Sequence, residues 1–127
     1  MSDEQWIPVT FASQWRDAVT TRGAATFLVF EGPDGTVTSW TYAEFDRLVA
    51  EVAETLRAAG AGRDRGVHLA LTNSPAFVAT WLAATSIAAA IVPSDPMGTA
   101  PELAEHVTRT RPAVGVCSLE RRDVYER

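Results

Sequence analysis

Residues 66–94 carry no Asp, Glu, Lys or Arg, and their apolar pattern predicts the centre of the fold. Two short runs, 67–72 and 90–93, are rich in aliphatic residues without polar alternation, which is typical of strands buried on both faces of a sheet. Between them apolar residues recur at helical spacing, and Asn73 or Ser74 can cap the start of that helix. This order predicts a βαβ unit whose two strands run parallel.

The helix of this unit is predicted to bury one face against the sheet. We expect Trp81 to be largely buried there, because a large aromatic side chain contributes strongly to a protein core. The longest apolar run, residues 76–93, barely reaches membrane-spanning length and is diluted by Ala, Thr and Ser, so no membrane span is predicted. The residues expected on the buried helical face are Phe77, Val78, Trp81, Leu82 and Thr85.

The chain before this unit predicts a short helix and a β-hairpin. Residues 11–19 have an apolar pattern compatible with a helix capped by Thr10 or Ser13. Residues 26–30 are typical of a strand, and the EGPDG segment that follows supplies the turn formers Pro, Asp and Gly. Residues 36–40 alternate as a second strand, so the two strands form a hairpin.

The segment after the hairpin carries the clearest helix pattern in the chain. Thr41 and Glu44 match a capping box, in which each side chain accepts a hydrogen bond from the other residue's backbone N–H. Gly60 is predicted to end the helix. Its apolar residues form one stripe with the charged residues elsewhere around the helix, and that stripe consists of Phe45, Leu48, Val49, Val52, Ala53 and Leu56.

The chain after the uncharged unit predicts another helix and another strand. Thr99 and Glu102 match a second capping box, and the helix ends before Pro112, since the residue preceding a proline avoids the helical conformation. Residues 113–117 form a third strand of the parallel type, and Ser118 opens a further helix. The candidates for the inner face of the helix are Leu103, His106 and Val107.

The order of these elements defines the predicted fold class. Strands and helices alternate after the hairpin, and such alternation is typical of a parallel sheet with right-handed crossovers. We therefore predict an α/β fold: a parallel βαβ sheet with helices on both faces, plus an N-terminal β-hairpin.

Composition narrows the function classes further. The chain has 127 residues, which is long enough for one domain with a hydrophobic core. Its formal net charge of −5 argues against a nucleic-acid partner, because the phosphates of nucleic acids attract basic surfaces. All eleven basic residues are Arg. The single Cys117 excludes an internal disulfide and is typical of a reducing compartment. The acidic N-terminus is unlike a secretory signal peptide, so a cytoplasmic location is expected.

Candidate chemistry is sparse, and no catalytic, cofactor-binding or metal-ligating residue is predicted. His68 lies in a strand and His106 on a helix, and neither has the spacing of a metal ligand or a nucleophile pair, so both are interpreted as structural. Cys117 is expected to be a small buried hydrophobe. Asn73 follows the carboxyl end of a parallel strand, where α/β sheets bind ligands, although helix capping also explains it. The GAGRDRG loop precedes a strand, whereas phosphate-binding loops follow one.

Three segments together resemble the N-terminal part of the adenylate-forming superfamily, and within it the acyl-CoA synthetases. They are SWTYAEFDRLVAEVAETLRAAG, VHLALTNSPAFVATWLAA and AIVPSDPMGTAPELAEHV, in the family's order and spacing. The resemblance implies a partial N-terminal subdomain, with an extension over residues 1–25, a matched region over 26–117 and the start of a helix over 118–127.

The resemblance also implies an activity for the complete enzyme. Such ligases use ATP and Mg to convert a carboxylic acid to an acyl-adenylate and then pass the acyl group to CoA or a carrier thiol. The family's phosphate loop, nucleotide-binding motifs and catalytic Lys lie in later segments, and this chain has no Lys. We therefore expect the chain alone to bind no cofactor, to be inactive, and to have the remaining C-terminal part of the ligase as its partner.

Two interpretations remain open at this level. In the first, the chain is the N-terminal portion of an ATP-dependent acyl-CoA synthetase whose remainder performs the chemistry. In the second, it is a free-standing, non-catalytic interaction module derived from that fold. The first is favoured, because the predicted sheet is left with an open edge.

Overall fold

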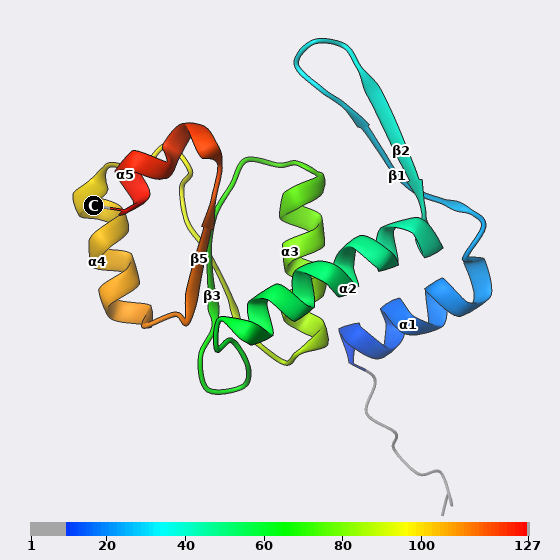
Figure 1. Cartoon of the computed structure of the whole chain (residues 1–127), viewed down its shortest axis with the longest axis horizontal. Helices are drawn as coiled ribbons and strands as arrows, with labels where there is room; N and C mark the ends of the chain where they lie inside the picture. Colours follow the sequence, from blue (N-terminus) through cyan, green and yellow to red (C-terminus); the bar gives the residue numbers. More distant parts are fainter. Residues whose placement is uncertain (1–9, 127) are drawn as a thin grey trace, which may run out of the picture.

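The computed structural model of the chain describes residues 10–126. Helices and strands alternate along the chain after an initial helix and hairpin (Figure 1). The elements are α1 (Phe11–Arg22), β1 (Thr26–Glu31), β2 (Val37–Thr41), α2 (Tyr42–Ala58), β3 (Val67–Ala70), α3 (Pro75–Ser86), β4 (Ile91–Pro93), α4 (Ala100–Thr110), β5 (Val114–Cys117), the 3-10 helix η1 (Leu119–Arg121) and α5 (Arg122–Glu126).

The parallel sheet has β3 at its centre, in the order β4-β3-β5. Val67 of β3 pairs with Ile91 of β4 and with Val114 of β5, and both pairings are parallel. All four residues of β3 are buried, as expected for a strand covered on both faces. The predicted parallel βαβ sheet is therefore confirmed. The predicted strand over residues 67–72 is two residues too long, because pairing with β5 ends at Ala70.

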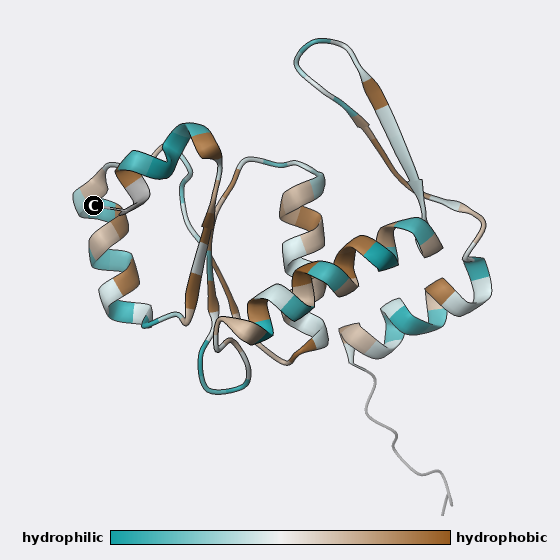
Figure 2. Ribbon diagram, viewed as in Figure 1, coloured by the Kyte–Doolittle hydropathy of each residue, from teal (hydrophilic) through white to brown (hydrophobic). Residues whose placement is uncertain are grey.

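Helices cover both faces of this sheet, as predicted. In Figure 1, α4 and α5 lie on one side of the strands, whereas α2 and α3 lie on the other. Helices α2 and α3 pack against each other, and α1 packs against both of them. The hydrophobic residues concentrate on the strands and on the inward side of α2 (Figure 2). Phe45, Val49, Ala53 and Leu56 of the predicted stripe are buried in the core.

The hairpin joins this core through aromatic side chains. Strands β1 and β2 are antiparallel, with Leu28 opposite Trp40, so the predicted hairpin is confirmed. Phe27 of β1 lies with its ring centroid 4.7 Å from that of Trp15 and 5.1 Å from that of Phe45. Trp15 comes from α1, which places a helix from the predicted extension within the core cluster.

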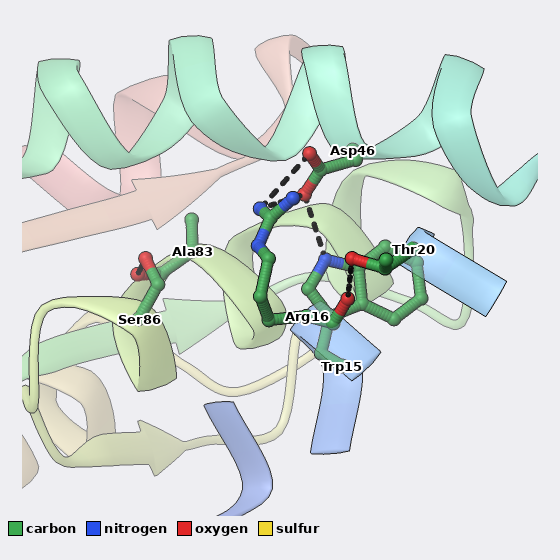
Figure 3. A network of polar contacts seen from close by, with 6 residues as sticks. All are labelled: Trp15, Arg16, Thr20, Asp46, Ala83 and Ser86. Carbon is green, nitrogen blue, oxygen red and sulfur yellow. Dashed lines mark hydrogen bonds and ion pairs between the residues drawn. The ribbon is translucent and has the colours of Figure 1, made fainter. Parts of the chain in front are cut away.

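A carboxylate on α2 holds α1 in place (Figure 3). Trp15 donates its indole N–H to Asp46 Oδ1 at 2.9 Å, and Arg16 Nη2 lies 2.9 and 3.0 Å from the two carboxylate oxygens of Asp46. The same view shows hydroxyl groups that bond within their own helices, from Thr20 to the Arg16 carbonyl and from Ser86 to the Ala83 carbonyl.

The helix starts follow the predicted capping chemistry. Thr41 and Glu44 form a reciprocal capping box at α2, and Thr99 forms one with Glu102 at α4. Helix α1 also begins with a capping box, between Thr10 and Ser13, and it extends to Arg22, three residues beyond the predicted end. Of the two candidate caps for α3, Ser74 is the one whose side chain accepts from the Phe77 N–H.

The helix ends differ in detail from the predictions. Gly60 follows α2 with a positive φ of 97°, a conformation that glycine adopts at low cost. Helix α4 ends before Pro112, as predicted, and Arg111 takes a left-handed conformation with φ 47°. Leu103 of α4 is buried, whereas Val107 is exposed, so the predicted inner face was only partly right.

The predicted burial of Trp81 is wrong, because 51% of this residue is exposed. Helix α3 is apolar on all sides, and so its sequence does not define which face meets the sheet. The buried positions are occupied by smaller residues, including Ala79, Leu82 and Ala83. Trp81 instead stacks on Phe11 of α1, with ring centroids 6.4 Å apart and an interplanar angle of 12°.

Candidate functional site

The carboxyl ends of the three parallel strands form the edge at which open α/β sheets bind ligands. Asn73 follows β3, Ser94 follows β4 and Ser118 follows β5. Asn73 is exposed and is not the cap of α3, a role that Ser74 fills. Asn73 therefore stays a candidate polar group at this edge.

A pair of histidines lies beneath this edge. His68 of the central strand is fully buried, and its Nε2 atom lies 3.1 Å from Nδ1 of His106 on α4. The same Nδ1 atom lies 3.1 Å from Ser94 Oγ. The two histidines are 38 positions apart, and sequence reasoning, which interpreted each as structural, did not bring them together. This cluster joins β3, α4 and the β4–α4 loop.

The proton arrangement of this cluster follows from its geometry. A hydrogen bond between two imidazole nitrogens needs one proton on one of them, so a proton on both atoms would break the contact. Burial lowers the pKa of His68 below its ordinary value of 6.5, and the neighbouring His106 lowers it further. The lowered pKa favours the neutral form of His68, and the interpretation of this residue as structural stays a prediction.

The loop between β4 and α4 is held by an arginine that sequence reasoning missed. Arg121, in η1, donates from its guanidinium to the backbone carbonyls of Pro96 and Gly98. Asp95 supports the same loop by accepting from the Met97 N–H at 2.8 Å. No local pattern marked Arg121, since it pairs with residues more than twenty positions away.

Two further features singled out in the sequence are Cys117 and the GAGRDRG loop. Cys117, at the end of β5, is only partly buried rather than enclosed, since β5 is one of the two edge strands of the sheet. The GAGRDRG loop lies at the amino end of β3, opposite the edge formed by the carboxyl ends of the strands. Arg65 in this loop donates to the Pro112 carbonyl at 2.8 Å, a bond that joins the starts of β3 and β5.

A hollow with a volume of about 730 Å³ lies between α2 and β5. A smaller one of about 240 Å³ lies beside His106 and Ser94 and is lined by charged residues of α4. Across residues 10–126, no three His, Cys, Asp or Glu side chains come together in a way that could hold a metal ion. None of the helices in this part of the chain has the length and apolar character that crossing a bilayer requires.

The fold and the sequence both match a known family. The profile described as AMP-binding enzyme matches residues 15–126, which is most of the chain. The chain belongs to the AMP-binding enzyme family. The resemblance to adenylate-forming enzymes is thereby confirmed, and the α/β fold is that of the family's N-terminal domain.

Curated relatives support this family assignment. The 4-coumarate–CoA ligase 1 of Oryza sativa subsp. japonica is 43% identical over 65 residues, covering 50% of this chain and 12% of the relative. The crotonobetaine/carnitine–CoA ligase of Citrobacter koseri is 32% identical over 79 residues, covering 62% of this chain and 15% of the relative. The chain thus spans less than a fifth of the length of these two curated relatives.

Solved structures share the fold of this chain. The N-terminal domain of FACL13 from Mycobacterium tuberculosis superposes with a TM-score of 0.83 at 22% identity, covering 94% of this chain and 30% of that one. An acyl-CoA synthetase from Brucella canis superposes with a TM-score of 0.75 at 24% identity, covering 80% of this chain and 19% of that one.

Proposed function

We propose that this chain is the N-terminal portion of an ATP-dependent acyl-CoA synthetase that converts a carboxylic acid to an acyl-adenylate and transfers the acyl group to CoA. The observation that carries the proposal is the family match over residues 15–126. The names of the curated relatives agree, since both are CoA ligases that differ in their acid. ATP, Mg and CoA belong to the complete enzyme, and the cytoplasmic location stays a prediction.

The role of this chain within such a ligase is structural support. Acyl-adenylate formation needs positive groups around the transferring phosphates. Several arginines of this chain already have other partners: Arg16, Arg57 and Arg109 pair with carboxylates, whereas Arg65 and Arg121 bond backbone carbonyls. The chain has no Lys. We therefore assign the nucleotide chemistry and the catalytic residues to the rest of the ligase.

The alternative of a free-standing interaction module has no support among the relatives, which are CoA ligases. The experiment that separates the two interpretations replaces part of a known ligase. In the replacement ligase, this 127-residue chain takes the place of the corresponding segment of the rice 4-coumarate–CoA ligase 1. The measured quantity is ATP–pyrophosphate exchange in the presence of 4-coumarate.

The proposal predicts exchange activity in the replacement ligase and none in the rice enzyme from which the segment is deleted. A third protein, in which an unrelated α/β domain of similar length fills the gap, controls for simple spacing and should be inactive. Exchange in that control, or none in the replacement ligase, would contradict the proposed role.

A further inference from the structure

An uncharged trough of about 300 Å³ runs between α3 and the edge strand β4. On the helix, the residues that line it are four positions apart, so they form one stripe along the axis. On the strand side they are two positions apart, so their side chains share one face of the sheet. The lining residues are Phe77, Trp81 and Thr85 on the helix and Ala89, Ile91 and Pro93 on the strand side.

Aromatic rings form the helical wall of this trough and continue it to the start of α1. Phe77 and Trp81 lie edge to face, with their ring centroids 6.3 Å apart. Trp81 stacks in turn on Phe11, the first residue of α1. Phe11 is 53% exposed and Trp81 is 51% exposed. Exposed apolar side chains that adjoin one another in this way mark a contact site, whereas scattered ones do not.

The chemistry of the trough favours an uncharged occupant that is held by its side chains. None of the lining residues is charged, so a charged occupant would lose hydration without gaining a partner. Backbone pairing is also limited. The Ser94 N–H donates to the Leu69 carbonyl and the Val67 N–H to the Ala90 carbonyl, an alternation that turns Pro93 to the free edge of β4. Proline has no N–H to offer a further strand there.

The chain itself supplies a suitable segment beside the trough. Residues 6–9, which lie outside the described part of the chain, read WIPV and carry no charge. Pro8 favours an extended conformation in the residue before it, and Thr10, which follows the segment, is extended with φ −96° and ψ 160°. Four extended residues span roughly 14 Å, and the helix from Phe77 to Thr85 rises about 12 Å, so the two lengths match.

Helix α1 gives this segment a tether but no apolar partner of its own. An apolar residue just before a helix cap commonly packs on the fourth residue of the helix. In α1 that residue is Gln14, which is polar and exposed. Because the segment is joined to a helix whose first residue already contacts Trp81, its effective concentration at the trough is on the order of millimolar. A separate partner would have to compete with it at that concentration.

We infer that the trough between α3 and β4 is the docking site of residues 6–9 of this chain. Neighbouring side chains of an extended segment point in opposite directions, so Trp6 packs on the aromatic α3 wall while Ile7 packs on the β4 wall at Ile91. The docked segment covers the exposed rings and anchors the start of α1. This inference is independent of the proposed function, since the occupant and the trough belong to the same chain.

Three isoleucines make the contact measurable by NMR. Labelling of their δ1-methyl groups gives one probe in the segment, Ile7, one in the trough, Ile91, and one outside it, Ile87. We expect a nuclear Overhauser effect between the methyl groups of Ile7 and Ile91 in the 127-residue chain, and none between Ile7 and Ile87. Deleting residues 1–9 should shift the methyl resonance of Ile91, because the ring of Trp6 is removed, and should leave that of Ile87 unchanged.

A matched pair of variants tests the trough. Thr85 and Thr108 each donate a hydroxyl to the carbonyl four residues earlier in their helices at 2.8 Å, but only Thr85 lines the trough. Thr85→Arg should abolish the contact between the two methyl groups, because the guanidinium would bring a charge into an apolar site. Thr108→Arg should preserve it. Both variants should keep the far-ultraviolet circular dichroism of the parent.

A second pair of variants tests the segment without altering the folded core. Trp6→Ser should weaken the contact between Ile7 and Ile91 and shift the Ile91 methyl resonance, because the aromatic wall loses its partner. Gln5→Ser, at the neighbouring position, should leave both unchanged. If Thr85→Arg fails to fold, this pair decides: loss of the contact in Trp6→Ser alone supports the inference, and loss in both variants or in neither overturns it.

Several results would overturn the inference. The first is the absence of a contact between Ile7 and Ile91 in the monomeric parent. A contact that survives in a folded Thr85→Arg variant is the second, because the segment would then lie elsewhere. An Ile91 resonance that moves with protein concentration as dimers form is the third, since a second copy of the chain would then occupy the trough. None of these results would alter the proposed function, which the replacement ligase tests separately.

Discussion

Removing the Asp46 carboxylate tests how α1 is held to the rest of the domain (Figure 3). In Asp46→Ala, the indole N–H of Trp15 loses its 2.9 Å partner, although the residue stays buried. A buried donor left without a partner costs about 1–3 kcal/mol. The ion pair with Arg16 adds little, about 0–1 kcal/mol, because 62% of the arginine side chain is exposed. The free energy of unfolding should therefore fall by about 1–4 kcal/mol.

Three control variants separate the indole bond from the ion pair. Asp46→Asn keeps an oxygen for the Trp15 N–H but removes the charge, so it should cost about 1 kcal/mol or less. Arg16→Ala should cost a similar small amount. Glu54→Ala removes the exposed pair with Arg57 on α2 and should change stability by no more than about 0.5 kcal/mol.

Urea unfolding of the 127-residue chain, followed by the fluorescence of its four tryptophans and by circular dichroism, provides the measurement. The reasoning fails if Asp46→Ala lies within about 0.5 kcal/mol of the parent, since an unpartnered buried donor costs more than that. It also fails if Arg16→Ala costs as much as Asp46→Ala, because the exposed ion pair would then carry the stability.

Three further predictions concern the core, the strand entry and pH. Trp81→Ala should lower the free energy of unfolding by about 1–2 kcal/mol, well below the about 3–5 kcal/mol expected for Phe45→Ala, whose side chain is fully buried. Equal decreases for the two variants in denaturant unfolding would contradict the observed exposure of Trp81. Gly66→Ala would place a methyl group 2.7 Å from a backbone carbonyl oxygen. It should lower the free energy of unfolding by about 1–3 kcal/mol and therefore lower the melting temperature. Gly62→Ala should leave the melting temperature unchanged, because no atom lies within 4 Å of the added methyl group. Burial lowers the pKa of His68 from 6.5, so the unfolded chain binds more protons than the folded one. The contribution of His68 to stability is therefore full above pH 6.5 and is lost as the pH falls through the lowered pKa. His68→Leu should reduce this loss of stability in melts between pH 7.5 and 5, and an unchanged pH dependence would refute the reasoning.

Local chemistry made much of the fold predictable. The capping boxes of Thr41 and Thr99 depend only on residues three positions away, and they fixed the starts of α2 and α4 without tertiary information. The uncharged run around β3 likewise marked the central strand, because only a strand covered on both faces tolerates four consecutive buried residues.

Features that depend on distant partners could not be predicted. The orientation of α3 was missed because its apolar residues surround the whole helix, so that the packing of α1 and α2 decides where Trp81 points. The contact between His68 and His106 depends on how α4 crosses the sheet. Arg121 reaches the β4–α4 loop only once β5 is in place.

The central claim, that this chain supports a ligase but does not perform nucleotide chemistry alone, is tested most directly by ATP–pyrophosphate exchange with the purified 127-residue chain. The assay would use Mg, ATP and a panel of aromatic and aliphatic carboxylic acids, with equilibrium dialysis of ATP in parallel. The account predicts exchange at background for every acid and no saturable ATP binding up to millimolar concentrations. Exchange above background with any acid, or saturable binding of ATP, would contradict it.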